Sequence, residues 1–147
     1  MPDITPRPEN PQKLLAPVLV TFVIVAIAGG IVLYSFTGFG ARARAKKLQN
    51  PVPPTPEAIA AARLIYENRC ANCHGIDGDG KGPKAEELSV APADFRNARV
   101  MGAITDGEIY WQITKGARPM PSFESLPEET RWQLVDYIRT FAPRSSP

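Results

Sequence analysis

The sequence of 147 residues predicts an all-α protein, in which a single transmembrane helix and a Pro-rich linker precede a small helical domain. Three observations favour this fold class. No charged residue lies between Lys13 and Arg42, so the N-terminal third contains one long apolar segment. Residues that commonly begin helices recur in the C-terminal two thirds. No segment alternates apolar and polar residues as a half-buried β-strand does.

The composition excludes several classes of protein. A hydrophobic fraction of 44% with 22% charged residues argues against a disordered chain, and two cysteines cannot build a disulfide-dense scaffold. The net charge of +2 conceals an uneven distribution: residues 1–49 contain six Lys/Arg and two Asp/Glu, while residues 50–147 contain eleven and thirteen. The C-terminal part is therefore mildly acidic, and nucleic acid is not an expected partner.

The apolar segment covers residues 14–36. As a helix its 23 residues would extend about 35 Å, and about 20 residues suffice to cross a bilayer core. We predict an extended tail over 1–13 and a transmembrane helix over 14–39. Ala26 and Gly30, four residues apart, either permit the close approach of another helix or reflect the ordinary frequency of small residues in such helices.

A cleaved signal peptide is the competing interpretation of this segment. Residues 41–43 read Ala-Arg-Ala, which is an Ala-x-Ala cleavage pattern. The apolar region of a signal peptide is only 7–15 residues long, however, and this segment is far longer. An uncleaved anchor is therefore the favoured interpretation.

A basic and Pro-rich linker is predicted over 40–56. It starts with four cations, Arg42, Arg44, Lys46 and Lys47. The prolines of 50–56 then favour polyproline II, a semi-rigid spacer of about 20 Å at about 3.1 Å per residue.

The domain over 57–147 begins with a helix that continues to Arg69, with Thr55 as its N-cap. Its expected buried residues are Ile59, Leu64, Ile65 and Tyr66. Glycine and proline predict mostly loop over 75–100.

Two further helices are expected. Residues 105–108 form a capping box for a short helix that ends near Gly116, and residues 125–128 form another, with Pro127 at the first helical position. The last helix ends before Pro143, and its expected core residues are Trp132, Val135, Ile138 and Phe141.

The chemistry of the domain centres on Cys70-Ala-Asn-Cys73-His74, a C-x-x-C-H sequence at the end of a predicted helix. This is the signature of c-type haem attachment. Two thiols one helical turn apart can bond to the two vinyl groups of one porphyrin, and the adjacent histidine is then directed at the iron. A thioredoxin-like pair would need a preceding strand, and a zinc site would be one ligand short. A plain disulfide between the cysteines is the third alternative.

If His74 is the proximal ligand, the sixth iron ligand must be something other than histidine, since the chain has one His. The methionines are Met1, Met101 and Met120. Prolines on both sides of Met120 stiffen its loop, and such rigidity would hold a weak thioether ligand in place. Met101 follows Val100 in an apolar stretch and is assigned to core filling. Met120 is therefore the expected distal ligand.

On these residues, the segment from 57 to 142 resembles a class I, monohaem cytochrome c domain. The matching residues are Cys70, Cys73, His74, Pro83, Met120 and Tyr137. The resemblance implies one covalently attached haem c, with iron ligated by His74 and Met120. It also implies that the Pro83 carbonyl accepts a hydrogen bond from His74, and that Tyr137 packs near Tyr66. Ala62 stands where the family usually has glycine, which predicts a slightly wider helix crossing.

The Gly-rich loop and residues 91–96 resemble membrane-tethered cytochromes of respiratory and photosynthetic complexes. Arg96 and Arg118 are candidates to pair with the haem propionates; the alternative, that each is a solvated surface charge, stays open. A six-coordinate iron suits electron transfer better than substrate chemistry. We expect a non-enzymatic electron-transfer subunit, and the alternative is a haem sensor or small catalytic haem domain with a displaceable distal ligand.

The expected partners are the membrane, other subunits of an electron-transport complex, and protein electron donors and acceptors. Alternative complex III is the first expectation, followed by a cytochrome bc or cbb-type complex or a reaction centre. The basic cluster of 42–47 would favour a cytoplasmic position, whereas covalent haem attachment in this family occurs outside the cytoplasm. Because long domains translocate largely regardless of flanking charge, we predict a single-pass protein of the inner membrane with an extracytoplasmic haem domain.

Overall fold

The computed structural model describes residues 12–36 and 38–142, and within these it is helical with no strand, as predicted. An isolated β-bridge joins Ala117 and Met120. The predicted tail over 1–13 lies largely outside the described residues, as does Pro143. The chain divides into two compact units, 1–41 and 42–147, which are described separately.

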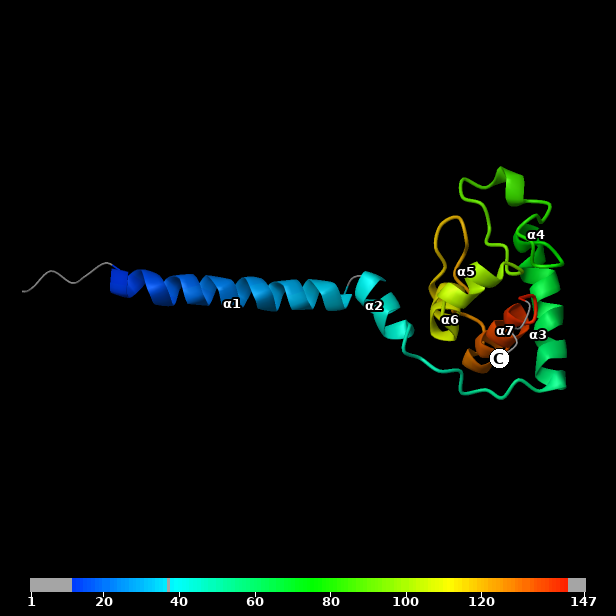
Figure 1. The fold of residues 1–147 in the computed structure, drawn as a ribbon, viewed down its shortest axis with the longest axis horizontal. Coiled ribbons are helices and arrows are strands. Elements are labelled where there is room, and N and C mark those ends of the chain that lie inside the picture. The colour runs from blue at the N-terminus through cyan, green and yellow to red at the C-terminus, as the bar shows by residue number, and fades with distance from the viewer. Residues whose placement is uncertain (1–11, 37, 143–147) are drawn as a thin grey trace, which may run out of the picture. The chain divides into compact units, whose positions relative to one another are not determined.

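The first unit consists mainly of helix α1 (Gln12–Phe36), drawn in blue in Figure 1. Its residues 17–34 have a mean hydropathy of 2.5 and are long and apolar enough to cross a membrane. An anchor and a signal sequence both satisfy this criterion. Helix α2 (Gly38–Ala45) follows. Arg42 and Arg44 are therefore helical, which the sequence analysis did not anticipate.

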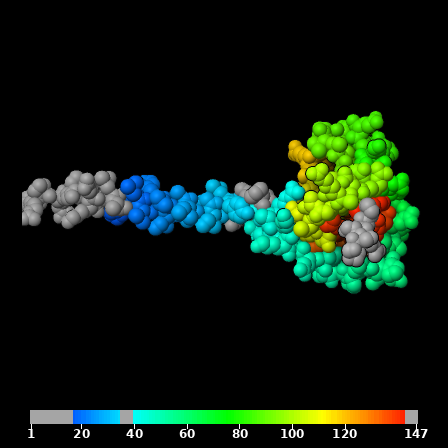
Figure 2. Space-filling view, in the orientation of Figure 1, coloured from blue at the N-terminus to red at the C-terminus, as the bar shows by residue number. Residues whose placement is uncertain are grey.

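The second unit contains one 3-10 helix, η1 (Ala85–Glu87), and five α-helices within its described residues. These are α3 (Pro56–Arg69), α4 (Ala71–His74), α5 (Ala98–Ala103), α6 (Asp106–Lys115) and α7 (Glu128–Arg139). In the space-filling view, the green segment near residues 80–90 lies at the top of this unit, with the orange segment near residue 120 beside it (Figure 2).

The helix starts confirm two predictions and correct a third. The Thr55 side chain accepts a hydrogen bond from the Ala58 N–H, and Thr105 and Glu108 form the predicted capping box. The capping box predicted at Ser125 is wrong, since α7 has Pro127 as its N-cap and no side-chain cap. The chain still turns at that point, where the Leu126 N–H donates to the Phe123 carbonyl.

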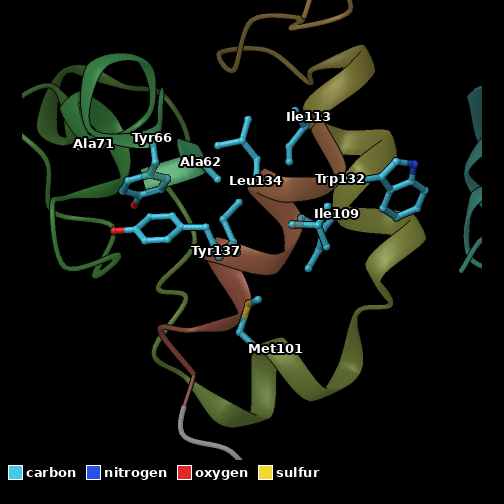
Figure 3. Close-up of a cluster of buried hydrophobic side chains, with 11 residues drawn as sticks. Ala62, Tyr66, Ala71, Met101, Ile109, Ile113, Trp132, Leu134 and Tyr137 are labelled. Carbon is cyan, nitrogen blue, oxygen red and sulfur yellow. The ribbon is translucent and has the colours of Figure 1, made fainter. Parts of the chain in front are cut away.

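The core forms where α3 packs against α7. Ala62 and Tyr66 of α3 are fully buried. The rings of Tyr66 and Tyr137 pack edge to face with their centroids 5.2 Å apart, as the resemblance implied (Figure 3). The prediction for Leu64 is wrong: it is 62% exposed. It lies two residues before Tyr66 and therefore on nearly the opposite side of the helix.

The remaining core predictions hold to different degrees. Trp132, Val135 and Ile138 of α7 are buried as predicted. Phe141 is partly buried and lies beyond the end of α7, with its ring 5.2 Å from the Tyr66 ring. Ile59 and Ile65 are also partly buried against the core.

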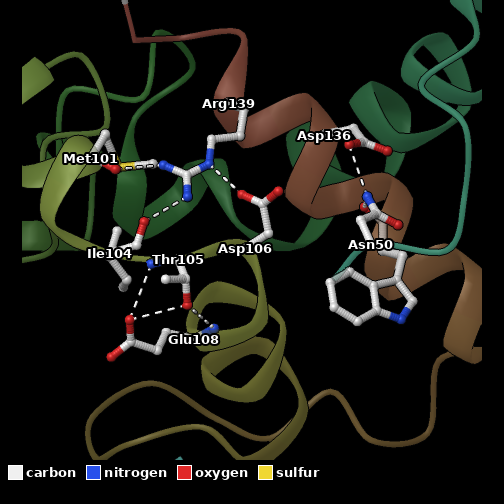
Figure 4. A network of polar contacts seen from close by, with 9 residues as sticks. Asn50, Met101, Ile104, Thr105, Asp106, Glu108, Asp136 and Arg139 are labelled. Atoms are coloured by element: carbon white, nitrogen blue, oxygen red, sulfur yellow. Dashed lines mark hydrogen bonds and ion pairs between the residues drawn. The ribbon is translucent and has the colours of Figure 1, made fainter. Parts of the chain in front are cut away.

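Part of the predicted spacer packs on the domain instead of standing free. Ala45 is buried, and a Cβ atom on Gly107 would overlap its carbonyl oxygen. The Asn50 amide donates to the Asp136 carboxylate at 2.9 Å (Figure 4), and Val52 packs against the core. We refer to residues 45–52 as the strap.

Candidate haem-binding site

A cavity of about 370 Å³ lies within the second unit. Its volume falls in the usual range of about 300–1,000 Å³ for ligand sites. Most of its lining is apolar, and helices α3, α4, α5, α6 and α7 all contribute. Cys70, Cys73, His74 and Met120 all line it, so the fold brings together the four residues that the sequence analysis placed at the haem.

The motif forms one wall of the cavity, which we call the proximal wall. The N–H groups of Cys73 and His74 both donate to the Cys70 carbonyl, at 3.1 and 2.9 Å. This hydrogen bonding turns the chain from α3 into the short helix α4. Both cysteines are free thiols in the structure, so the disulfide alternative is not formed.

The loop after the motif is fastened to it by the main chain. The N–H groups of Gly80, Gly82 and Lys84 donate to carbonyls of the motif, at 2.8, 3.1 and 2.9 Å. A Cβ atom at Gly82 would lie 2.4 Å from the Ala71 carbonyl oxygen, so only glycine permits this approach. Pro83 is thereby held beside the motif, although it does not line the cavity.

His74 carries a polar atom without a partner. Its Nδ1 is buried and has no hydrogen bond among the described residues. The hydrogen bond that the resemblance implied, from His74 to the Pro83 carbonyl, is therefore not formed here and stays a prediction. The imidazole stacks on the Phe95 ring at 4.7 Å. Burial lowers the pKa of His74, which favours the neutral imidazole that metals bind.

Burial also affects two neighbours of the histidine. It raises the pKa of the Cys70 thiol to about 11, so the thiol is protonated at neutral pH. It raises the pKa of Tyr66 as well, and the Tyr66 hydroxyl donates to the Gly75 carbonyl at 2.8 Å. This bond links α3 to the residue that follows the motif.

The opposite wall, which we call the distal wall, is formed by α6 and the loop over 116–123. The N–H groups of Ala117 and Met120 each donate to the other residue's carbonyl, at 3.1 and 2.8 Å. The Ser122 hydroxyl donates to the Thr114 carbonyl at 2.6 Å, and the Gln112 amide donates to the Met120 sulfur at 3.8 Å. The loop is thus attached to the end of α6, with Met120 partly buried against the core.

The other predicted site residues are placed differently. Met101 is 4% exposed and belongs to the core, as predicted, but it also lines the cavity. Arg118 is exposed and lines the cavity, so it remains a candidate for a propionate. Arg96 does not line it, and its guanidinium pairs with the Asp94 carboxylate at 3.0 and 3.1 Å.

These residues fit a c-type haem. Two free thiols and an imidazole with an unpartnered buried nitrogen stand on one wall, and a thioether stands on the other, around an apolar space. Among the described residues no group of three or more His, Cys, Asp or Glu could hold a metal ion, which disfavours the zinc alternative. Sequence reasoning missed Gln112, because no local pattern relates a glutamine to a methionine eight residues later.

An all-α fold with this donor set around an apolar cavity defines a c-type cytochrome domain. The family model described as cytochrome c oxidase, cbb3-type, subunit III matches residues 57–138. The chain belongs to this family, and its C-terminal part is a monohaem cytochrome c domain.

Seven chains of solved structures match this chain, among them the following two. One is a chain of the Kuenenia stuttgartiensis reducing HAO-like protein complex Kustc0457/Kustc0458, with 34% identity and a TM-score of 0.58 over 63% of this chain. This chain spans only 47% of that chain's length. The other is the KustC0563 c-type cytochrome, with 28% identity and a TM-score of 0.49 over 56% of this chain and 98% of that one. No curated protein matches the chain.

Proposed function

We propose that the chain is a membrane-anchored monohaem cytochrome c that transfers single electrons through a His/Met-ligated, covalently attached haem. The observation that carries the proposal is the placement of His74 and Met120 in the lining of one apolar cavity. Haem c supplies an iron that alternates between the ferric and ferrous states. All other parts of the function depend on the residues of the chain.

The two walls would perform different parts of that work. Cys70 and Cys73 would hold the cofactor, each thiol S–H adding across a vinyl C=C bond to form a thioether. His74 would supply a neutral nitrogen from the proximal wall, and Met120 a sulfur from the distal wall. The apolar side chains between them exclude water, which keeps the reorganisation around the iron small. Arg118 at the rim is suited to pair with a propionate.

The fold supports a carrier in preference to a catalyst. If His74 and Met120 both bind the iron, no position would be left there for a substrate or a gas. The competing function is a sensor or catalytic haem domain, in which the distal ligand leaves readily. Carbon monoxide separates the two, because it binds ferrous haem only where the sixth position opens.

The Met120→Ala variant tests this proposal. Reduced full-length protein should not bind carbon monoxide, and its ferric form should show a sulfur-to-iron charge-transfer band. Met120→Ala should lose the band completely, bind carbon monoxide and have a lower reduction potential. Met101→Ala is the matched control and should keep the band. Ready binding of carbon monoxide by the unaltered protein would overturn the proposal.

We further propose that α1 anchors the chain in the inner membrane with the haem domain outside the cytoplasm. The length and hydropathy of residues 17–34 support an anchor. A membrane-impermeant amine reagent applied from outside should label Lys46 and Lys47 and leave Lys13 protected. The reverse pattern would overturn the orientation, and a mature chain starting at residue 44 would identify a signal peptide instead.

The partner we propose is a quinol-oxidising or terminal electron-transport complex. Alternative complex III was the first expectation from the sequence, whereas the description of the matching family model favours a cbb3-type oxidase. A cytochrome bc complex or a reaction centre is the next candidate, because it would also exchange electrons with the haem. Purification of the native membrane complex identifies the partner, and recovery of the chain without other redox subunits would contradict the proposal.

A further inference from the structure

Two methionine side chains reach the same cavity. Met101 comes from α5 and Met120 from the loop after α6, and both line the space beside His74. Both are thioethers, so chemistry alone does not decide which sulfur serves as the distal ligand. The surroundings of the two sulfurs differ, and the difference lies in one neighbouring side chain.

That side chain is Gln112. It lies on the same face of α6 as the buried residues Ile109 and Ile113, and all three line the cavity. A primary amide on an apolar wall is costly unless its hydrogen-bonding groups find partners. Its Nε2 donates to the sulfur of Met120 at 3.8 Å. Among the described residues, no comparable bond reaches the sulfur of Met101.

Donor and acceptor are both fixed to the same helix. The Gly116 N–H donates to the Gln112 carbonyl at 2.8 Å, and the Phe123 N–H donates to the Ile113 carbonyl at 3.0 Å. The loop that carries Met120 is therefore attached at both ends to the last turns of α6. The Gln112 amide and the Met120 sulfur therefore belong to segments that are adjacent in the chain and bonded to each other.

Arg131 of α7 also stabilises the end of α6 to which the Met120 loop is attached. The residue is 9% exposed, and its guanidinium donates to the Thr114 hydroxyl at 2.6 Å and lies 5.0 Å from the centroid of the Tyr110 ring. The carbonyl of the same Thr114 accepts the Ser122 hydroxyl. The end of α6 is thus hydrogen-bonded both to α7 and to the loop over 116–123. These bonds keep Gln112 and Met120 in place relative to each other.

We propose that Gln112 is a positioning residue that selects Met120 over Met101 as distal ligand and tunes the strength of that ligand. This inference rests on the proposed function. A thioether sulfur has two lone pairs: one would bind the iron, and the other accepts the N–H of Gln112. The hydrogen bond withdraws electron density from the sulfur. Because the ferric iron depends more on donated density than the ferrous iron, the bond favours the ferrous state and raises the reduction potential.

The test compares Gln112→Leu and Gln112→Ala in the full-length holoprotein. Both variants remove the donor and differ in bulk. Both should shift the ferrous-to-ferric ratio at a fixed applied potential about two- to tenfold toward ferric, the equilibrium equivalent of one hydrogen bond. Both should also move the ferric sulfur-to-iron charge-transfer band. The matched control is Gln133→Leu, since Gln133 bonds to Glu129 on the outside of α7 at 3.3 Å and does not line the cavity.

The outcomes distinguish this inference from the function on which it rests. If the unaltered protein shows a band that Met120→Ala abolishes, but both Gln112 variants keep its position and the ratio, then Gln112 has no such role and the carrier function stands. A different outcome is that the ratio and the band shift in Gln112→Ala and stay unchanged in Gln112→Leu. Such a dependence on side-chain volume would show that Gln112 acts by packing and not by its hydrogen bond, and would also overturn the inference. If the unaltered protein lacks the band altogether, the proposed function itself fails.

Discussion

The two walls of the cavity are held by different kinds of interaction. On the proximal wall, main-chain hydrogen bonds join the motif to the loop over 80–84, and the rings of Tyr66 and Tyr137 pack behind it. On the distal wall, main-chain bonds also attach the loop over 116–123 to α6, but side chains add further bonds: Gln112 bonds to Met120, and Arg131 and Arg139 of α7 bond to residues of α5 and α6. The proximal wall is thus held mainly by main-chain bonds between neighbouring segments, whereas the distal wall depends more on side-chain bonds, two arginines of α7 among them.

The difference indicates where the protein tolerates change. Main-chain bonds survive most substitutions, so the thiols and the imidazole keep their positions when neighbouring side chains vary. Bonds made by side chains are lost with a single substitution, so the distal ligand and the potential it sets are open to adjustment.

Arg139→Met should destabilise the protein most. Arg139 of α7 bonds to the Asp106 carboxylate at 2.7 Å and to the carbonyls of Met101 and Ile104 at 2.5 and 2.6 Å (Figure 4). Methionine keeps the apolar stem and leaves these acceptors without a donor. We expect the free energy of unfolding to fall by about 2–3 kcal/mol, measured by guanidinium unfolding of the full-length protein in detergent.

The matched control for that variant is Arg63→Met. Arg63 pairs with Glu67 at 2.6 Å on an exposed face of α3, and its side chain is 64% exposed. Solvent screens such a pair, so no measurable change in unfolding is expected. Equal losses for the two variants would show that Arg139 acts as an ordinary surface charge and would weaken the contrast between the walls.

Tyr66→Phe should lower the free energy of unfolding less than Arg139→Met does. The variant removes the buried bond from the Tyr66 hydroxyl to the Gly75 carbonyl and keeps the ring. Since several main-chain bonds hold the same turn, we expect a loss of about 1 kcal/mol in the free energy of unfolding. Tyr137→Phe is the control, because the structure shows no hydrogen bond of that hydroxyl among the described residues. If Tyr66→Phe lowers the free energy of unfolding more than Arg139→Met does, the proximal wall depends on side-chain bonds more than the distal wall does. The contrast between the two walls would then be reversed.

The same contrast explains what the sequence could predict. The all-α class, the caps at Thr55 and Thr105, and the burial of Tyr66 follow local patterns, and the structure confirms them. The placement of Met120 in the cavity also agrees with the expectation drawn from its prolines. The prediction that Leu64 is buried was wrong because helical spacing identifies the buried face only approximately when neighbouring positions are also apolar.

The features that sequence analysis missed depend on contacts distant in the chain. Arg139 bonds to residues more than thirty positions earlier, and Asn50 bonds to a residue 86 positions later. Nothing near Asn50 distinguishes a strap that packs on α7 from a free polyproline spacer. The failed capping box at Ser125 has a related cause, because the turn at Phe123 and Leu126 delays the start of the helix.

Asp136→Asn should have the smallest effect and serves as the reference for both walls. Asp136 lies on α7 and does not line the cavity. One carboxylate oxygen accepts the Asn50 amide at 2.9 Å, and the other is buried with no partner among the described residues. Burial raises the pKa of the Asp136 carboxyl, and the bond from Asn50 opposes this only in part.

A carboxyl whose pKa is higher in the folded state than in the unfolded state binds more protons when folded. Its contribution to stability is therefore greatest at low pH and is lost as the pH rises through the folded pKa. Asparagine removes the charge, so Asp136→Asn should be more stable than the unaltered protein at neutral pH. Because Asp136 is only partly buried, solvent still screens much of its charge, and the gain should stay below about 1 kcal/mol.

The measurement is guanidinium unfolding of both proteins at several pH values from neutral to acid. The advantage of Asp136→Asn should shrink as the pH falls and the natural carboxyl takes up its proton. The charge-transfer band and the reduction potential should not move, since the substitution touches neither wall. A variant that is less stable at every pH would show that the strap depends on an ionised Asp136 accepting the Asn50 amide. In that case the bond from Asn50 outweighs the cost of burying the charge.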